Sequence, residues 1–214
     1  MAACCPLNTG KLNIKKMAYD KFTTLTSSVV PLPIENVDTD QIIPARFLKA
    51  TTRDGFGDNL FRDWRYNGDN TPKEDFILNN PIYTGKILLG GKNFGSGSSR
   101  EHAAWAVYDY GFRCVVSSFF ADIFKNNCLN IGVLPVQISP EFSNEIFEAV
   151  YADPKTEVEI DLKAQTITLL SSGTKESFDI NGYKKDNMLN GFDDIDYLQN
   201  MKSEIEAFTE SRPF

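Results

Sequence analysis

The sequence is poor in the residues that build metal sites and disulfide frameworks. Its 214 residues include one histidine, His102, and four cysteines, at positions 4, 5, 114 and 128. The cysteines show neither CxxC nor CxxxC spacing, so the common metal-binding and redox motifs are excluded. Cys114 and Cys128 stand among apolar residues, where cysteine behaves as a small hydrophobic residue. We therefore expect reduced, structural cysteines and no metal bound by this chain.

Positive charge is also scarce. Lys and Arg number 22 against 29 Asp and Glu, which gives a net charge of -7, and a field of this sign repels nucleic-acid phosphates and acidic lipid headgroups. No apolar run approaches the ~20 residues that span a bilayer, and the start, MAACCPLNTGKLNIKKMAYDKF, lacks the apolar core of a secretory signal. The sequence predicts a soluble, cytoplasmic protein that binds neither nucleic acid nor membrane.

The composition that remains is that of an ordinary globular protein. Apolar residues make up 42% of the chain and charged residues 24%, which argues against general disorder. Residues 1–16 are thin in core residues, and we expect them to form a disordered leader. Because no internal repeat or low-complexity linker follows, residues 17–214 are predicted to fold as one domain.

A strand, a glycine-rich loop, a helix and a second strand form the clearest pattern in the chain. KILLG at 86–90 predicts a strand, GKNFGSG a loop, and SSREHAAWAVYDYG a helix that ends at Gly111. A further strand starts at Arg113. This βαβ unit predicts an α/β fold.

The other predicted elements extend this fold. Two short strands are predicted at the start of the chain, at residues 22–25 and 29–32. Pro31 and Pro33 indicate that the second of these strands is an edge strand or a turn. Ser139 and Pro140 are the residue types of a helix N-cap and first helical position. The remaining expectations are a helix at 119–126, a strand at 132–138, a hairpin at 157–162 and 166–170, and an amphipathic helix at 194–211.

A long irregular segment separates the opening strands from the βαβ unit. Residues 49–75, KATTRDGFGDNLFRDWRYNGDNTPKED, mix glycine, acidic and aromatic residues without strand or long helix periodicity. Residues 60–66 predict one short helix within it. A loop of this length inside a compact domain is usually functional, so we expect the segment to take part in the activity.

The stretch GGKNFGSGSSREH, residues 90–102, places four glycines and three serines around one arginine, one glutamate and the only histidine. Ser98 and Glu101 fit the capping box S-x-x-E, so we expect Ser98 to cap a helix that starts at Ser99. The free amides and the dipole of a helix N-terminus attract an anion. Arg100 adds a planar, bidentate grip on a carboxylate. The stretch therefore predicts a site for a small anion.

A structural interpretation of the same stretch stays open. The loop fits neither GxxxxGK[ST] nor GxGxxG, so the standard nucleotide motifs are excluded, but the glycines can simply turn the chain while the serines cap the helix. His102, in the first helical turn, is interpreted as a hydrogen-bonded structural residue. A serine acts as a base only where a helix terminus and a cation stabilise its alkoxide.

The segments GKNFGSGSSREHA and NVDTDQIIPARFL resemble the aconitase family, in particular its isopropylmalate dehydratase branch. The resemblance continues through GFGDNLFRDWRY, DYGFRCVVSSFFADIFKNN, LPV at 134–136 and MLNGFDDIDYLQ, and it covers residues 21–198. GSSRE alone indicates the wider family. DTDQIIP, the loop with NLFRDWRY and the MLNG-x-D ending point to the branch that acts in leucine biosynthesis, and residues 1–16 depart from the family pattern.

The resemblance implies a swivelling β/β/α domain like the mobile C-terminal domain of aconitase, made here as a separate chain. The branch removes water from 2-isopropylmalate and returns it to give 3-isopropylmalate, with a four-iron, four-sulfur cluster as Lewis acid on the departing hydroxyl. Three cysteines hold that cluster, and this chain lacks the set. The resemblance therefore implies the small subunit of a hydro-lyase, active only with a large subunit that carries the cluster.

The family motifs also assign roles to residues. Ser98 matches the serine that removes the proton next to the carboxylate, so it is the candidate catalytic residue. Ser99 and Arg100 match positions that bind the substrate carboxylate. Asp40, the second acid of DTD, matches an active-site aspartate that supports this network.

A second substrate arginine and a specificity loop are also implied by the resemblance. Arg53 is the nearest counterpart of that arginine, and Arg46 is its rival. The loop at residues 48–66 lies where the family recognises the variable substituent of the substrate. An apolar wall for an isopropyl group is expected to come from one or more of three residues in this loop, Phe56, Leu60 and Phe61.

Two alternatives stand beside the isopropylmalate assignment. One is the small subunit of a related diacid hydratase, of the citraconate or homoaconitate type. The other is a non-catalytic module that binds an anion at the helix N-terminus. An iron-responsive nucleic-acid binder is disfavoured by the net charge of -7 and by the missing cluster cysteines.

Overall fold

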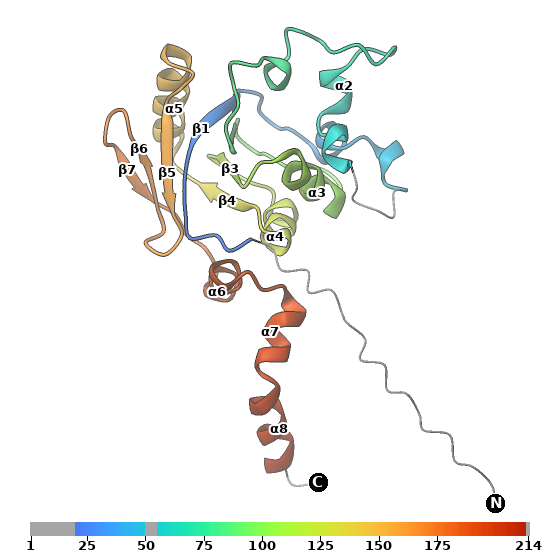
Figure 1. Cartoon of the computed structure of the whole chain (residues 1–214), viewed down its shortest axis with the longest axis vertical. Helices are drawn as coiled ribbons and strands as arrows, with labels where there is room; N and C mark the ends of the chain where they lie inside the picture. The colour runs from blue at the N-terminus through green and yellow to red at the C-terminus, as the bar shows by residue number, and fades with distance from the viewer. Residues whose placement is uncertain (1–19, 50–54, 213–214) are drawn as a thin grey trace, which may run out of the picture.

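One mixed seven-stranded sheet forms the centre of the computed structural model, which describes residues 20–49 and 55–212. The strand order is β4-β3-β2-β1-β5-β6-β7 (Figure 1). β1 to β4 run parallel, and β5 to β7 continue the sheet in antiparallel pairs. The strand bounds are β1 Thr24–Leu32, β2 Ile87–Gly90, β3 Cys114–Ser117, β4 Leu134–Gln137, β5 Glu157–Asp161, β6 Thr166–Leu169 and β7 Lys175–Ser177.

Helices connect the parallel strands. α3 (Glu101–Tyr110) links β2 to β3 and α4 (Asp122–Ile131) links β3 to β4, so the predicted βαβ unit is confirmed and a second one follows it. α5 (Pro140–Ala152) leads to β5, and the Ser139 hydroxyl accepts a hydrogen bond from the Phe142 backbone N–H at 3.2 Å, as the N-cap prediction requires. The remaining helices are α1 Thr39–Ile42, α2 Arg62–Arg65, α6 Gly182–Asn190, α7 Asp194–Asn200 and α8 Lys202–Ser211, with 3-10 turns η1 Ala45–Phe47, η2 Phe56–Asn59 and η3 Ile77–Asn79.

Two apolar clusters lie on opposite faces of the sheet. Leu88 packs in the cluster that contains the buried side chains of α3 and α4, whereas Ile87 and Leu89 pack in the cluster that contains those of α5. This alternation is the period of two that a strand imposes on its side chains. Because helices cover both faces, β2 is apolar without interruption, as strands buried on both sides are.

β1 is one continuous strand, so the prediction of two separate short strands is wrong, whereas the edge position predicted at Pro31 is confirmed. Residues 24–28 of β1 pair with β5 and residues 29–32 pair with β2. At Pro31, opposite Leu89, the described strand therefore has a neighbour on one side only. A proline without an N–H is tolerated where the missing donor has no partner strand to reach.

Several element boundaries differ from those predicted. The helix expected at 119–126 starts at Asp122, because Phe120 is held in an extended bridge with Phe94. The tail expected as one helix at 194–211 is α7 and α8, which meet at Met201. The hairpin at 157–170 and the short helix within 60–66 are confirmed, whereas α1, α6 and β7 were not predicted.

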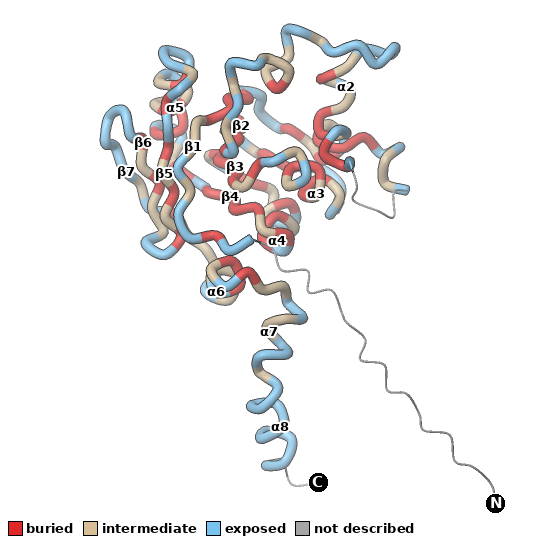
Figure 2. The backbone as a smooth tube through the Cα atoms, viewed as in Figure 1, coloured by how far each residue is buried: buried red, intermediate tan, exposed pale blue. Residues whose placement is uncertain are grey.

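α7 and α8 extend away from the sheet as an arm (Figures 1 and 2). The apolar side of the predicted amphipathic pattern is present, but it faces solvent in this chain, with Ile195, Leu198, Ile205 and Phe208 each 47–62% exposed. The expected leader, residues 1–16 with Cys4 and Cys5, lies outside the described residues. Arg53 also lies outside them.

Candidate active site

The two motif segments lie side by side at the carboxyl ends of neighbouring parallel strands. Residues 33–43 follow β1 and residues 91–100 follow β2. The backbone N–H of Thr39 donates to the Ser96 carbonyl at 2.8 Å, and the N–H of Gly95 donates to the Val37 carbonyl at 2.7 Å. The carboxyl edge of parallel strands is where α/β folds place their ligands. The sheet thus brings together the DTD and GSSRE motifs, which are about 60 residues apart in the chain.

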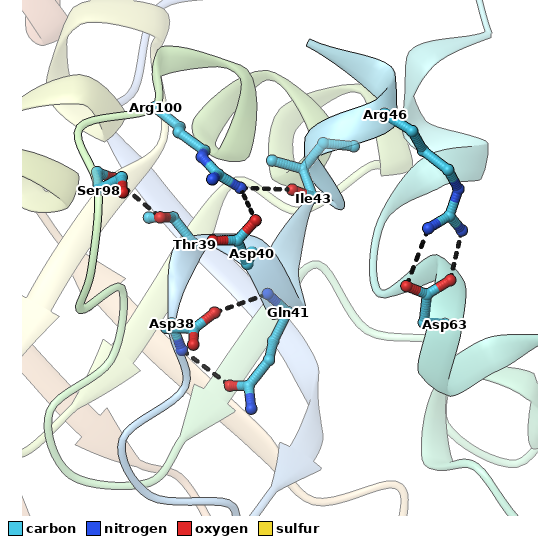
Figure 3. A network of polar contacts seen from close by, with 9 residues as sticks. All are labelled: Asp38, Thr39, Asp40, Gln41, Ile43, Arg46, Asp63, Ser98 and Arg100. Carbon is cyan, nitrogen blue, oxygen red and sulfur yellow. Dashed lines mark hydrogen bonds and ion pairs between the residues drawn. The ribbon is translucent and has the colours of Figure 1, made fainter.

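Thr39 ties the two segments together at the candidate serine. Its hydroxyl donates to the backbone carbonyl of Ser98 at 2.8 Å, and Thr39 itself is 2% exposed (Figure 3). Sequence reasoning missed this role. Thr39 is the central residue of the DTD motif, so the motif did include it. A hydrogen bond from a side chain to a distant backbone carbonyl, however, leaves no residue spacing that the sequence could reveal.

The glycines of the loop serve close approach and an unusual backbone conformation. Gly95 has φ +79° and Gly97 has φ +91°, in the region that residues with a Cβ rarely adopt. A Cβ on Gly95 would overlap Cβ and Cγ of Phe124 on α4. The loop therefore lies directly on the helix that follows β3.

Gly95→Ala is expected to destabilise the protein by about 3 kcal/mol, because the new methyl group meets Phe124 and the backbone is left-handed there. Urea unfolding of the variant measures this value. Gly111→Ala is the matched control, since Gly111 also has positive φ but no atom lies within 4 Å of its added Cβ. The control should cost about 1 kcal/mol; equal losses in the two variants would contradict the packing argument.

The predicted capping box at Ser98 is wrong. α3 begins at Glu101, its N-cap residue is Arg100, and no side chain caps it. A capping box occurs instead in the other motif segment, where the Asp38 carboxylate accepts from the Gln41 N–H at 2.8 Å and the Gln41 side chain accepts from the Asp38 N–H at 2.9 Å (Figure 3). The serines thus lie before the helix, in the loop that leads into it.

Because the helix starts later than predicted, the run of backbone N–H groups without a hydrogen-bond acceptor is longer than the first turn of the predicted helix would have provided. Within the described part of the chain, the backbone N–H groups of residues 97–102 donate no hydrogen bond. Four of these residues, Gly97, Ser98, Ser99 and Glu101, are exposed to solvent. Consecutive unpaired N–H groups before a helix attract an anion.

Arg100 and Asp40 form the ion pair at the centre of the site. The Arg100 side chain is 12% exposed and pairs with the Asp40 carboxylate, whose side chain is 54% exposed (Figure 3). Arg100 Nη1 also donates to the Ile43 carbonyl at 3.3 Å. The structure therefore brings together four of the five predicted site residues, Ser98, Ser99, Arg100 and Asp40.

The other predicted residues lie apart from this group. Arg46 is paired with Asp63 on α2, and Arg53 is not among the described residues. The three residues expected to form an apolar wall belong to the core and are at most 2% exposed: Phe56, Leu60 and Phe61. That expectation is wrong as a surface feature, because these side chains are buried in the core cluster that also contains the buried side chains of α3.

His102 packs as a core-facing ring. Its ring lies 4.6 Å from that of Trp105 and 5.8 Å from that of Phe56, centroid to centroid. The ring contacts fit a packing role for His102, but among the described residues they take the place of the hydrogen bond that the sequence interpretation expected.

Among residues 20–49 and 55–212, no group of three or more His, Cys, Asp or Glu side chains is arranged to hold a metal ion. Over the same residues, no helix is both long enough and apolar enough to cross a membrane.

Comparison with known proteins agrees with this geometry. A family model described as the aconitase C-terminal domain matches residues 19–141, and a second, LeuD_N, matches residues 144–182. The 3-isopropylmalate dehydratase small subunit of Cytophaga hutchinsonii is 62% identical over 195 residues, which are 91% of this chain and 97% of that protein. The protein of the same name from Karelsulcia muelleri is 52% identical over 189 residues, 88% and 96% of the two chains.

A solved structure shows the same fold. The crystal structure of a 3-isopropylmalate dehydratase from Methanocaldococcus jannaschii superimposes with a TM-score of 0.63 at 24% identity, over 86% of this chain and 98% of that one. The chain therefore belongs to the aconitase C-terminal domain family, and the expected fold class is confirmed. Within that family, its relatives place it among the small subunits of 3-isopropylmalate dehydratase.

Proposed function

We propose that this chain supplies the proton-accepting serine and the carboxylate-binding site of a 3-isopropylmalate dehydratase in leucine biosynthesis. As a member of the small-subunit family, the chain is a component of a dehydratase, which is a hydro-lyase. The observation that carries the assignment of residues is the run of free amides at 97–102 beside the Arg100–Asp40 pair. This arrangement suits the carboxylate of a small dicarboxylate.

The proposed chemistry of this chain is proton transfer next to a held carboxylate. Ser98 Oγ accepts the proton from the carbon beside one carboxylate as the hydroxyl leaves the adjacent carbon. In the second half of the reaction the hydroxyl adds to the carbon that lost the proton, and Ser98 returns a proton to the carbon that lost the hydroxyl. Negative charge grows on the carboxylate during the first step. Arg100 and the amides stabilise that charge because they are already oriented toward it. Asp40 keeps the Arg100 fork in place.

The iron–sulfur cluster is assigned to a partner. No described group of residues in this chain fits such a cluster, and we propose that the large subunit holds it and that it acts there as Lewis acid. The free thiols Cys114 and Cys128 are fully buried, and burial raises the pKa of both well above the usual value. Buried free thiols are common in reducing compartments, so we place the complex in the cytoplasm.

Arg53 is proposed as the second substrate arginine. Arg46, its rival, already donates both terminal nitrogens to Asp63. The apolar wall for the isopropyl group must then come from residues other than the buried Phe56, Leu60 and Phe61. The large subunit is the proposed source.

Reconstitution tests the proposed function. The chain is mixed with its large subunit, and turnover is measured for 2-isopropylmalate, citraconate and homoaconitate. We expect turnover of 2-isopropylmalate with the pair and none with either chain alone. Preference for another diacid would assign the chain to a related hydratase, and tight dicarboxylate binding by the isolated chain without turnover by the pair would identify an anion-binding module.

A further inference from the structure

Thr39 holds the loop of the candidate serine through two hydrogen-bond donors. Its backbone N–H donates to the Ser96 carbonyl at 2.8 Å. Its hydroxyl donates to the Ser98 carbonyl, also at 2.8 Å (Figure 3). A Cβ built on Gly97, between these two residues, would lie 3.5 Å from the Thr39 hydroxyl oxygen. The loop therefore passes directly beside Thr39, and two of its carbonyl groups face that residue.

These two bonds fix the direction of two backbone N–H groups. The described peptide bonds are all trans, and a trans peptide unit points its C=O and its N–H in opposite directions. Because the Ser96 carbonyl faces Thr39, the N–H of Gly97 points away from Thr39. In the same way, the bond from Thr39 to the Ser98 carbonyl turns the N–H of Ser99 away. Both residues are exposed, and within the described part of the chain neither N–H donates a hydrogen bond.

The short helix that begins at Thr39 also holds the Arg100 side chain. Asp40 pairs with the guanidinium, and Arg100 Nη1 donates to the Ile43 carbonyl at 3.3 Å. The Ile43 N–H in turn donates to the Thr39 carbonyl at 2.9 Å. α1 and the residue after it therefore set the position of the Ser99 amide relative to the Arg100 guanidinium.

We propose that Thr39 is a positioning residue for the reaction, whose hydroxyl orients the Ser98–Ser99 peptide unit so that the Ser99 N–H meets the substrate carboxylate beside Arg100. The inference rests on the proposed function, because that function supplies the carboxylate. A backbone donor that is oriented in advance stabilises charge well, since it need not turn when the charge arrives. Thr39 is 2% exposed, so its hydroxyl acts through the peptide unit and does not itself contact the substrate.

Thr39→Val removes the hydroxyl and keeps the shape of the side chain. We expect the KM of the reconstituted pair for 2-isopropylmalate to rise about tenfold, because a hydrogen bond to a charged group is weakened. The kcat should stay within about threefold, because the amide holds the carboxylate before the proton leaves as well as afterwards. Thr39→Ser keeps the hydroxyl donor, and its KM should stay within about twofold of the wild-type value.

Thr156→Val is the matched control. Thr156 is 7% exposed, and its hydroxyl donates to the Ala149 carbonyl on α5 at 3.1 Å. The control loses the same kind of buried hydrogen bond outside the site, so its stability should fall while its KM stays unchanged. A wild-type KM for Thr39→Val would contradict the positioning role, and so would an equal rise in KM for Thr156→Val.

A second pair of variants covers the case in which Thr39→Val does not fold. Thr39→Ala and Thr39→Ser differ by the hydroxyl alone. The KM of Thr39→Ala should be about tenfold above that of Thr39→Ser, for the same loss of one oriented donor. Equal KM values in these two variants would overturn the proposal.

NMR relaxation of the isolated chain measures the effect of the hydroxyl without any activity. In Thr39→Val the order parameters of the Ser98 and Ser99 amides should fall from about 0.85 to below about 0.6. The Gly97 amide should change less, because the Thr39 backbone N–H still holds the Ser96 carbonyl. Unchanged order at Ser99 would contradict the proposal. Failure of the wild-type pair to turn over 2-isopropylmalate would instead refute the proposed function, so the two failures are distinguishable.

Discussion

Ser98→Ala is expected to lower kcat of the reconstituted pair by roughly 10²- to 10⁴-fold, the usual contribution of a positioned general base. The serine is exposed beside the free amides of residues 97–102, and the Thr39 hydroxyl fixes its carbonyl. Because its side chain accepts no hydrogen bond and donates none within the described chain, its removal leaves the fold intact. KM should change little, since Arg100 and the amides still hold the substrate.

Ser96→Ala is the matched control for this experiment. Ser96 lies in the same loop, and within the described part of the chain its hydroxyl makes one long contact, of 3.5 Å to the Val37 carbonyl. The control should keep near wild-type kcat. Co-purification with the large subunit and unchanged unfolding curves show that both variants fold and assemble. A Ser98→Ala pair that retained wild-type rates would remove Ser98 as the base.

Arg100→Lys is expected to reduce kcat/KM by about a hundredfold, although the positive charge is retained. Lysine lacks the planar fork that suits a carboxylate, and it cannot reproduce the bonds of Arg100 to both Asp40 and the Ile43 carbonyl. Arg100 is 12% exposed, so solvent screens its interactions less than those of a surface ion pair. Steady-state kinetics of the reconstituted pair give the ratio.

Arg113→Lys is the control for a change of the same chemistry outside the site. Arg113 stacks on the Tyr108 ring at 4.0 Å and donates to backbone carbonyls at the end of α3. Its kinetics should match those of the wild type. If Arg100→Lys were equally silent, the substrate carboxylate would not be held by Arg100.

The parts of the fold that the sequence predicted are those with strong local signals. KILLG and the alternating hairpin at 157–170 have clear strand patterns, and Ser139-Pro140 carries the chemistry of a helix start. The position of β1 was not predictable, because pairing of residues 24–28 with β5 and of residues 29–32 with β2 is a tertiary arrangement. Pro31 correctly indicated an edge position, but the split into two strands that the sequence suggested does not occur.

The candidate site shows the same division. The motifs predicted Ser98, Arg100 and Asp40, and the structure places them together. The capping box did not form at Ser98, since Ser98 lies before the helix with its carbonyl held by Thr39. A four-residue pattern cannot show that a distant side chain holds this backbone outside the helix.

The error over the apolar wall has a physical cause. Phe56, Leu60 and Phe61 stand in a segment without periodicity, which gives no indication of which face each side chain takes. Arg65 and the η2 turn fold this segment inward, so the three side chains enter the core cluster. From the sequence alone, aromatic residues in a long loop fit the wall of a pocket as well as they fit the core. Only the tertiary packing shows which of the two they form.

The most direct test is a structure of the assembled pair with 2-isopropylmalate bound. We predict a substrate carboxylate within about 3 Å of the Arg100 guanidinium and of backbone N–H groups in residues 97–102, with Ser98 Oγ facing the carbon that loses its proton. A substrate bound elsewhere, with these amides covered by side chains of the large subunit, would contradict the account.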